Sequence, residues 1–245
     1  MSKDTTYIFD VDGTLTRPRS RIEPDFEAFF KTFVANNKTY LISGSDIGKI
    51  REQLPEDILW GCRGVFGCSG AEFWQNGILQ YQIDHEFPDA MVSEFQAFID
   101  DSPYRERHGN HIEMRIGMIN ISVVGRNASQ EQRKHYFNWD KIAKERADFV
   151  TEFNNSSRPY EASAGGEISI DIVPQGHNKS MVMPEILKRE PDNCLVFFGD
   201  KLAPGGNDAP LGNALIKAGK PHEAIPVKNF QNTWDELKVR ALNHA

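Results

Sequence analysis

The sequence predicts an α/β fold with a mostly parallel sheet, interrupted by an inserted α+β domain with an antiparallel sheet. Near both ends of the chain, short apolar runs alternate with helical patterns, which is typical of a parallel sheet covered by helices. From about Ile83 to Pro174, apolar residues instead recur at every second position, as in half-exposed antiparallel strands. We therefore expect a core of residues 1–82 and 175–245 and an inserted domain of residues 83–174.

The first part of the core is expected to contain three strands and two helices. The apolar run that ends at Asp10 predicts a buried strand. Residues 23–36 place phenylalanines at helical spacing, with Pro24 at a favourable first helical position. The next elements are predicted to be a strand at 39–42, a helix with capping residues at 45–54 and a glycine-punctuated strand at 64–70.

The inserted domain and the last part of the core are predicted from the same two periodicities. In the insertion we expect helices at 88–100 and 129–153 and antiparallel strands within 111–124 and 166–173. After it, we expect a helix at 178–190 and a strand at 194–200. This last strand ends, like the first, at an aspartate.

Composition limits the classes of protein that fit this chain. Its 245 residues carry 28 basic and 35 acidic side chains, and the formal net charge of −7 argues against a nucleic-acid-binding protein. Cys62, Cys68 and Cys194 form no even framework, which suits a reducing compartment. No apolar stretch approaches the roughly 20 residues that span a bilayer, and the first residues lack a secretory signal. We expect a soluble cytoplasmic protein.

Asp10 and Asp12 follow the first predicted strand and stand two residues apart. Side chains at this spacing point the same way, so both carboxylates converge beyond a parallel strand, where open α/β sheets bind ligands. Two close carboxylates repel each other unless one is protonated or a cation intervenes, and Mg²⁺ prefers such oxygen ligands. The alternative is a motif that only caps a solvated turn.

A second strand that ends at an aspartate favours the metal site. Asp200 follows the apolar run "CLVFFG", and a glycine-rich loop then leads to Asn207 and Asp208. A third carboxylate at a neighbouring strand end would complete an oxygen shell for Mg²⁺. We therefore expect Asp10, Asp12 and Asp200 to bind the metal, with Asn207 and Asp208 in supporting positions.

The stretches "DVDGT", "LISGSD", "GHNKS" and "GDKLAPGGND" resemble the motifs of the haloacid dehalogenase (HAD) superfamily of phosphoryl-transfer enzymes. This resemblance implies a Rossmann-like core with Asp10 as the nucleophile that forms an aspartyl-phosphate and Asp12 as the general acid/base. It further implies that Lys179 neutralises phosphate oxygens and the charge of Asp10, and that a hydroxyl group holds the phosphoryl group. Ser43 is preferred for this last role, and Ser45 is the alternative.

Four longer stretches resemble the eukaryotic-type phosphomannomutases: "FDVDGTLTRPRSRI", "IEMRIGMINISVVGRNASQEQR", "GGEISIDIVPQG" and "FFGDKLAPGGND". The agreement runs from about Tyr7 to Asp208. It implies interconversion of hexose (mannose) 6-phosphate and 1-phosphate through a hexose 1,6-bisphosphate, which also acts as activator. It also implies that the inserted domain is a cap that binds the phosphate that is not reacting and excludes water, and that two copies form a homodimer through their caps.

The inserted domain carries arginines that suit phosphate binding. Arg115 lies on the polar side of a predicted strand, Arg126 follows a strand end, and Arg133 falls in the first turn of a helix. That helix is expected to begin with a capping box of Ser129 and Gln132. Guanidinium groups and a helix N-terminus together can bind phosphate through bidentate and dipole-assisted contacts.

Other residues of the insertion suit a sugar. In "GGEISIDIV" the isoleucines share one face of the strand, so Ser169 and Asp171 share the other and can hydrogen-bond sugar hydroxyls. The family resemblance adds Arg19, after the first motif, to the substrate-binding residues. It also adds Asn120 or Met118.

Three stretches depart from the phosphomannomutase pattern. After GGND, relatives carry a Phe-Asp-Thr loop that binds a second cation, whereas this chain has "APLGNALIKAGKPHEAIP". "FGCSGAEFW" stands where relatives have Pro-Glu-Asn-Gly and resembles sugar phosphatases of the superfamily, and "GHNKS" replaces a Trp-Asp-Lys sequence. Three functions therefore remain open: a phosphohexomutase, favoured by the arginines; a Mg-dependent HAD sugar-phosphate phosphatase, favoured by the altered loop; and a binding protein, opposed by the intact aspartates.

Overall fold

A computed structural model of the protein describes residues 4–218 and 222–242. The chain divides into two compact units: a core unit of Met1–Ile83 and His177–Ala245, and an inserted unit of Asp84–Gly176. Each unit has its own sheet and its own hydrophobic core. The predicted α/β fold with a mostly parallel sheet and a separate antiparallel sheet is confirmed.

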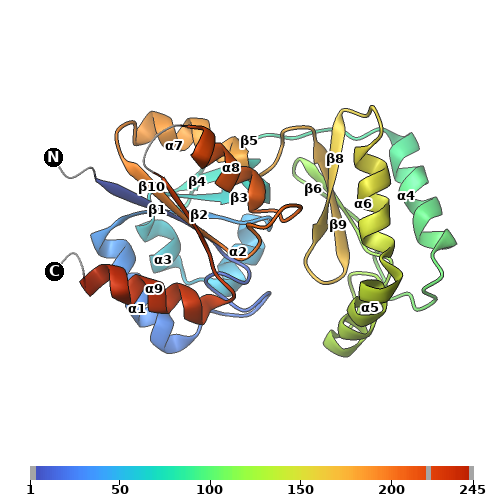
Figure 1. The fold of residues 1–245 in the computed structure, drawn as a ribbon, viewed down its shortest axis with the longest axis horizontal. Coiled ribbons are helices and arrows are strands. Elements are labelled where there is room, and N and C mark those ends of the chain that lie inside the picture. Colours follow the sequence, from blue (N-terminus) through green and yellow to red (C-terminus); the bar gives the residue numbers. More distant parts are fainter. Residues whose placement is uncertain (1–3, 219–221, 243–245) are drawn as a thin grey trace. The chain divides into compact units, whose positions relative to one another are not determined.

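The core unit is built on a seven-stranded sheet (Figure 1). In spatial order its strands are β11 (Glu223–Pro226), β10 (Cys194–Gly199), β1 (Thr5–Asp10), β2 (Lys38–Ile42), β3 (Gly64–Gly67), β4 (Glu72–Gln75) and β5 (Ile78–Gln82). The first five are mutually parallel, and β4 and β5 are antiparallel additions. Because β10, β1 and β2 are adjacent and parallel, their carboxyl ends lie side by side at one edge of the sheet.

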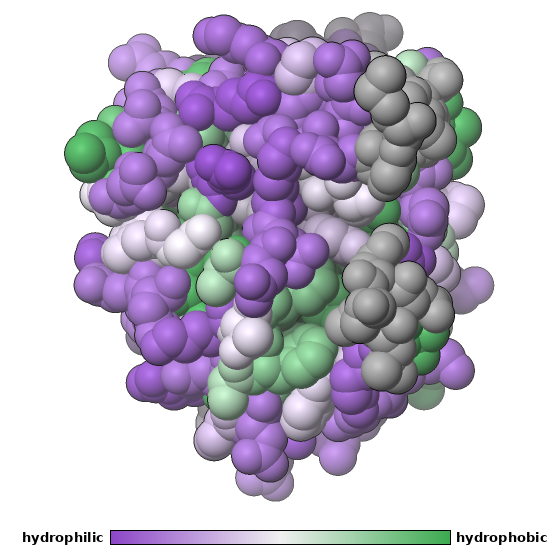
Figure 2. Space-filling model, turned by 90° about the vertical axis from the view of Figure 1, so that its left-hand side faces the viewer, coloured by the Kyte–Doolittle hydropathy of each residue, from purple (hydrophilic) through white to green (hydrophobic). Residues whose placement is uncertain are grey.

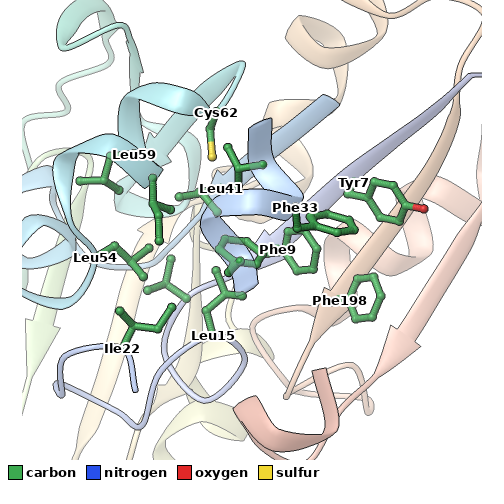
Figure 3. Close-up of a cluster of buried hydrophobic side chains, with 14 of the residues drawn as sticks. Tyr7, Phe9, Leu15, Ile22, Phe33, Leu41, Leu54, Leu59, Cys62 and Phe198 are labelled. Carbon is green, nitrogen blue, oxygen red and sulfur yellow. The ribbon is translucent and has the colours of Figure 1, made fainter. Parts of the chain in front are cut away.

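Helices cover both faces of this sheet. One face packs on α1 (Pro24–Asn36), α2 (Ile47–Gln53), α3 (Glu56–Gly61) and α9 (Phe230–Leu242), and the other packs on α7 (Met183–Arg189) and α8 (Ala209–Lys217). Alternate residues of β1 explain the two layers, because Tyr7 and Phe9 enter the first cluster and Ile8 the second. In the first cluster the ring of Phe9 contacts the rings of Phe33 of α1 and Phe198 of β10, and Figure 3 shows these side chains close to one another.

Helix α1 forms where the phenylalanine spacing predicts it. The Glu23 side chain accepts hydrogen bonds from the main-chain N–H groups of Asp25 and Phe26, and Pro24 lies in the first turn. These caps satisfy donors that have no partner within the helix. The face that carries Phe26 and Phe30 is fully buried against the sheet.

Two predicted elements of the core unit are shorter than expected. The strand predicted at 64–70 ends at Gly67, and the turn η1 (Cys68–Gly70) follows with left-handed φ values of 48° at Cys68 and 58° at Ser69. The main-chain N–H groups of these residues donate to the carbonyls of Ser45 and Ser43, in the loop that follows β2. The helix predicted at 178–190 begins instead with a 3₁₀ turn, η2 (Lys179–Val182), before α7.

The β4–β5 hairpin was not predicted. Its turn contains Asn76 and Gly77, both with positive φ. An Asn-Gly pair between two short strands is a strong hairpin signal, so this element was accessible from sequence.

The inserted unit has a four-stranded antiparallel sheet. Its strands, in spatial order, are β6 (Ile112–Arg115), β7 (Met118–Ile121), β9 (Ser169–Pro174) and β8 (Tyr160–Gly165). Ile119, Ile121, Ile170 and Ile172 form one face, which packs on α4 (Asp89–Asp101) and α6 (Glu145–Asn154), the two helices beside the sheet in Figure 1. The opposite face carries the polar residues described below.

The helix predicted at 129–153 is two helices in the structure. Helix α5 (Gln130–Ala143) begins with the expected capping box of Ser129 and Gln132, and Lys144 then adopts a left-handed φ of 59° before α6 starts. The Asp140 carboxylate accepts from both the main-chain N–H and the guanidinium Nε of Arg146, at 3.0 and 2.8 Å. This buried pair ties the end of one helix to the start of the next.

None of the helices in the described part of the chain is both long and apolar enough to cross a membrane. The face of the molecule drawn in Figure 2 is mostly hydrophilic and has a limited hydrophobic area at its centre. This surface agrees with the charged composition of the chain.

Candidate active site

The carboxyl edge of the parallel sheet gathers residues from distant parts of the sequence. Asp10 is the last residue of β1, Ser43 directly follows β2, and Asp200 directly follows β10. The parallel register pairs Phe9 with Phe198 and Asp10 with Ile42, so these three strand ends are level. These polar residues therefore lie at the edge where open α/β sheets bind their ligands.

Three carboxylates form a cluster at this edge. One oxygen from each of Asp10, Asp200 and Asp208 lies within 4.8 Å of the others. Asp10 is 3% exposed and Asp208 is fully buried. Asp208 is further held by the main-chain N–H of Lys201, which donates to its Oδ2 at 2.9 Å.

Lys179 is the counter-ion of this cluster. Its side chain is completely buried, and its Nζ donates to Oδ1 of Asp10 and, at 2.7 Å, to Oδ1 of Asp208. The lysine reaches this place because Asn178 caps η2, accepting from the main-chain N–H of Ser180. Burial opposes its charged form, but the charges of Asp10 and Asp208 outweigh that effect and raise the pKa of Lys179.

The charges of the cluster do not balance. Lys179 forms ion pairs with Asp10 and Asp208, and the charge of Lys201 also acts on Asp200, so the three carboxylates still carry more negative charge than the one buried ammonium offsets. Burial raises the pKa of Asp10 and of Asp200, because it penalises their charged forms. A divalent cation would restore the balance, and the donors present are the oxygen ligands that Mg²⁺ prefers.

Asn207 supplies a further observation that fits a metal. Its Oδ1 is buried and has no hydrogen-bond partner among the described residues. A buried acceptor without a partner is costly, and a cation would satisfy it. We therefore conclude that Asp10, Asp200 and Asp208 are suited to hold Mg²⁺, and that Asn207, the residue before Asp208, has a buried acceptor that a cation would satisfy.

Two glycines allow the cluster to close. A Cβ on Gly13, whose φ is +91°, would lie 2.5 Å from Oδ2 of Asp200. A Cβ on Gly199 would lie 2.7 Å from Oδ2 of Asp208. Any side chain at these positions would push a carboxylate out of place. Gly13, in the "DGT" turn, is therefore needed both to leave room for Asp200 and to adopt its positive φ.

Asp12 lies outside this carboxylate cluster. Its Oδ1 accepts from the main-chain N–H of Arg19 at 3.0 Å, and the hydroxyls of Ser43 and Ser45 each lie 3.5 Å from its Oδ2. Asp12 is thus not a member of the described cluster, whose third carboxylate is Asp208, and its role as a metal ligand stays a prediction. Asp12 instead contacts a main-chain N–H group and two hydroxyl groups.

The two serines proposed to hold a phosphoryl group remain alternatives. Ser43 is 1% exposed, and its Oγ accepts from the main-chain N–H of Ser45 at 3.0 Å. Ser45 is partly exposed and approaches the same oxygen of Asp12. Both hydroxyls therefore lie beside Asp12.

A cavity of about 480 Å³ adjoins the carboxylate cluster within the core unit. Its lining includes Gly13 and Asp200 as well as the basic residues Arg17 and Lys228. These two cationic side chains would attract an anionic group to the cavity, although the protein as a whole has a negative net charge. Arg19, two residues after Arg17, is exposed and has a left-handed φ of 58°.

The polar face of the inserted unit carries the predicted sugar-binding residues. Glu113 of β6 is paired with Asn120 of β7, and Asn120 with Asp171 of β9, so the three lie in one row across the sheet. The amide of Asn120 donates to Oδ1 of Asp171. Met118 lies on the same strand as Asn120 and is 2% exposed.

Two of the three predicted phosphate-binding arginines meet on this face. Arg115 and Arg126 both form ion pairs with the carboxylate of Glu113, and Nη1 of Arg126 also donates to the Ser169 hydroxyl at 2.8 Å. Arg133 instead donates to main-chain carbonyls, those of Ala128 at 2.9 Å and Arg126 at 2.7 Å. Arg133 therefore supports the loop that carries Arg126.

Sequence reasoning undervalued Asp208 and missed Glu113. Asp208 was given a supporting place, although its burial and its contact with Lys179 make it part of the cluster. Glu113 stands two residues before Arg115 on one strand, and this spacing alone places both side chains on one face.

Comparisons with known proteins identify the relatives of this chain. A family model described as eukaryotic phosphomannomutase matches residues 26–214. Phosphomannomutase from Encephalitozoon cuniculi is 34% identical over 249 residues, covering 97% of this chain and 94% of that protein. A probable phosphomannomutase from Caenorhabditis elegans is 32% identical and covers 84% of this chain and 85% of its own length.

Solved structures show the same fold in more distant proteins. An N-terminally truncated Plasmodium falciparum IMP-nucleotidase has a TM-score of 0.61 at 15% identity, covering 96% of this chain and 69% of that chain. The C-terminal domain of Candida albicans trehalose-6-phosphate phosphatase has a TM-score of 0.58 at 18% identity, covering 94% and 81%. At these identities the similarity concerns the fold alone.

Proposed function

Because the chain belongs to the eukaryotic phosphomannomutase family, we propose that it is a phosphohexomutase that interconverts mannose 6-phosphate and mannose 1-phosphate. The observation that carries the proposal is the buried contact of Lys179 with Asp10 and Asp208 beside Asp200 at the carboxyl edge of the sheet. A nucleophilic carboxylate needs such neutralisation to approach an anionic phosphate.

In the proposed reaction Asp10 carries the phosphoryl group as an aspartyl-phosphate. A free hydroxyl of the sugar phosphate attacks the phosphorus, the bond from phosphorus to the Asp10 oxygen breaks, and Asp12 takes the hydroxyl proton. The product of this half-reaction is a hexose 1,6-bisphosphate. In the reverse half-reaction Asp10 accepts the other phosphoryl group, and Asp12 returns the proton to the leaving oxygen.

Mg²⁺ bound by Asp10, Asp200, Asp208 and Asn207 would supply positive charge at the phosphoryl oxygens. Lys179 would keep the Asp10 oxygens oriented and offset their charge. The hydroxyl of Ser43 or Ser45 would position the phosphoryl group beside Asp12.

The inserted unit supplies groups for the rest of the substrate. We assign Arg115 and Arg126, supported by Arg133, to the phosphate that is not transferred, because guanidinium groups bind phosphate by charge-assisted hydrogen bonds. Ser169, Asp171 and Asn120 or Met118 would contact the sugar.

Several further properties belong to the same proposal. A hexose 1,6-bisphosphate would prime the enzyme by phosphorylating Asp10, and Arg19 would contact the substrate near Asp12. We also propose a cytoplasmic enzyme that forms a homodimer through its inserted domains, on the basis of family membership.

A sugar-phosphate phosphatase is the second candidate. It is favoured by the segment after Asp208, which enters α8 directly and offers no acidic side chain between residues 209 and 218. Residues 219–221 of this segment lie outside the described residues. In a phosphatase, water would replace the sugar hydroxyl in attacking the aspartyl-phosphate.

One assay separates these functions. The protein is incubated with mannose 1-phosphate, Mg²⁺ and a trace of hexose 1,6-bisphosphate, and both mannose 6-phosphate and inorganic phosphate are measured. The proposal predicts isomerisation well above phosphate release. Phosphate release at an equal or higher rate would reject the mutase in favour of the phosphatase, and no turnover would favour a binding protein.

A further inference from the structure

A single carboxylate joins the two arginines on the polar face of the inserted unit. Oε2 of Glu113 accepts from Nε of Arg115 at 2.9 Å and forms an ion pair with Nε of Arg126 at 3.4 Å. The arginine side chains are only 10% and 12% exposed, and that of Glu113 is 28% exposed. The three side chains therefore form a partly buried group rather than a solvated surface pair.

The backbone fixes Glu113 in this position. Ile112, its neighbour on β6, packs into the apolar cluster under α4 and α6, so the side chain of Glu113 must take the opposite face. Its pairing with Asn120, and that of Asn120 with Asp171, centres it on the polar row. Arg115 follows on the same face of the same strand.

The contacts also set the direction of each guanidinium group. Both arginines turn their Nε side toward Glu113, and Arg126 places one Nη on the Ser169 hydroxyl. An arginine is planar, so fixing one edge fixes the position of the others. Arginine side chains that were not held in this way would lose rotational freedom when they bind phosphate, which would weaken binding.

We propose that Glu113 is a positioning residue for the proposed mutase reaction, which holds Arg115 and Arg126 in the orientation that binds the phosphate not being transferred. This inference rests on the proposed function. It also predicts whether phosphate binding weakens or strengthens when Glu113 is removed. A carboxylate near a phosphate repels it, so a residue that mainly repelled would strengthen binding when removed. A positioning residue weakens binding when removed.

Two variants of Glu113 and one control variant test the direction of this change in affinity. Glu113→Gln keeps an oxygen acceptor and removes the charge, and Glu113→Ala removes both. Glu94→Gln is the control, because Glu94 also pairs with an arginine of the inserted unit, Arg158, but on an exposed surface. The full chain is used, with Mg²⁺, and mannose 6-phosphate affinity is measured by calorimetry without bisphosphate. Turnover and thermal unfolding are measured in parallel.

We expect binding to weaken roughly tenfold in Glu113→Ala, from the ordering cost of two arginines, and less in Glu113→Gln. KM should rise in the same order, while kcat at saturating substrate stays within about twofold. Glu94→Gln should match the wild type. If Glu113→Ala does not fold, Glu113→Gln decides the question alone.

Tighter binding in the Glu113→Gln variant, or affinity equal to that of the wild type, overturns the inference. A loss confined to kcat also overturns it. A wild-type protein that neither binds nor turns over mannose phosphates rejects the proposed function itself. A wild type that isomerises normally beside unaffected Glu113 variants rejects only the role of Glu113.

Discussion

The buried position of Lys179 permits a quantitative test of the catalytic cluster. Replacing it with methionine keeps much of the side-chain volume and removes the only ammonium that contacts Asp10 and Asp208 among the described residues. Because the lysine is 0% exposed, water cannot replace it. The variant must hold three carboxylates together without a cation, or protonate them.

The expected loss of stability follows from this burial. Removing one partner of a buried ion pair costs about 3–5 kcal/mol, because the remaining charge is left uncompensated. For a chain of this length, each kcal/mol lowers the melting temperature by about 2–4 °C, so the variant should melt roughly 6–20 °C below the wild type.

The measurement is thermal unfolding in EDTA, followed by mutase turnover in Mg²⁺. Lys188→Met is a matched control, since Lys188 is exposed on α7, and it should lower the melting temperature by less than about 2 °C. The double variant Lys179→Met with Asp208→Asn should regain part of the loss, because it removes one of the unpaired charges. An unchanged melting temperature for Lys179→Met, or a double variant less stable than the single one, would refute the electrostatic reasoning.

Three further substitutions test other parts of the site. Asp10→Asn should abolish turnover, because an amide cannot accept the phosphoryl group; measurable mutase activity would remove Asp10 as nucleophile. Gly13→Ala should cost about 1–3 kcal/mol of stability from its positive φ and should also weaken Mg²⁺ binding by displacing Asp200. Gly176→Ala, at a φ of +82° with open space around it, should show only the first effect, so calorimetric Mg²⁺ titrations that match for the two variants would contradict the steric argument. Arg126→Ala should weaken substrate binding by about 1–3 kcal/mol, seen as a higher KM, and an unchanged KM would exclude it from phosphate binding.

The elements that were predicted could be found because they depend on local periodicity, whereas α3, β4, β5, α8, β11 and α9 were not predicted. The buried Phe26, Phe30 and Phe33 of α1 show which side of that helix is buried, and the alternation of Ile168, Ile170 and Ile172 shows the same for β9 and the residue before it. The break at Lys144 was missed, because a helical apolar spacing continues across it while one left-handed residue interrupts the backbone.

The strand-end aspartates could also be found from sequence, since Asp10 and Asp200 each follow an apolar run. Their grouping with Asp208 could not. Asp208 meets Lys179 across 29 residues of chain, and only the packing of η2 against α8 brings the two together. Asp12, two residues from Asp10, was expected in the same group, but its carboxylate lies beside the hydroxyls of Ser43 and Ser45.

By itself, the sequence determined the fold class, the buried face of α1 and of β9, and the carboxylates at the ends of β1 and β10. Only the tertiary structure decided which charges neutralise one another: Lys179 with Asp10 and Asp208, and Glu113 with two arginines. The physical reason is the separation over which each kind of interaction acts. Periodicity and turn chemistry act between near neighbours in the chain, whereas ion pairing depends on distances in space that the sheet register and helix packing set.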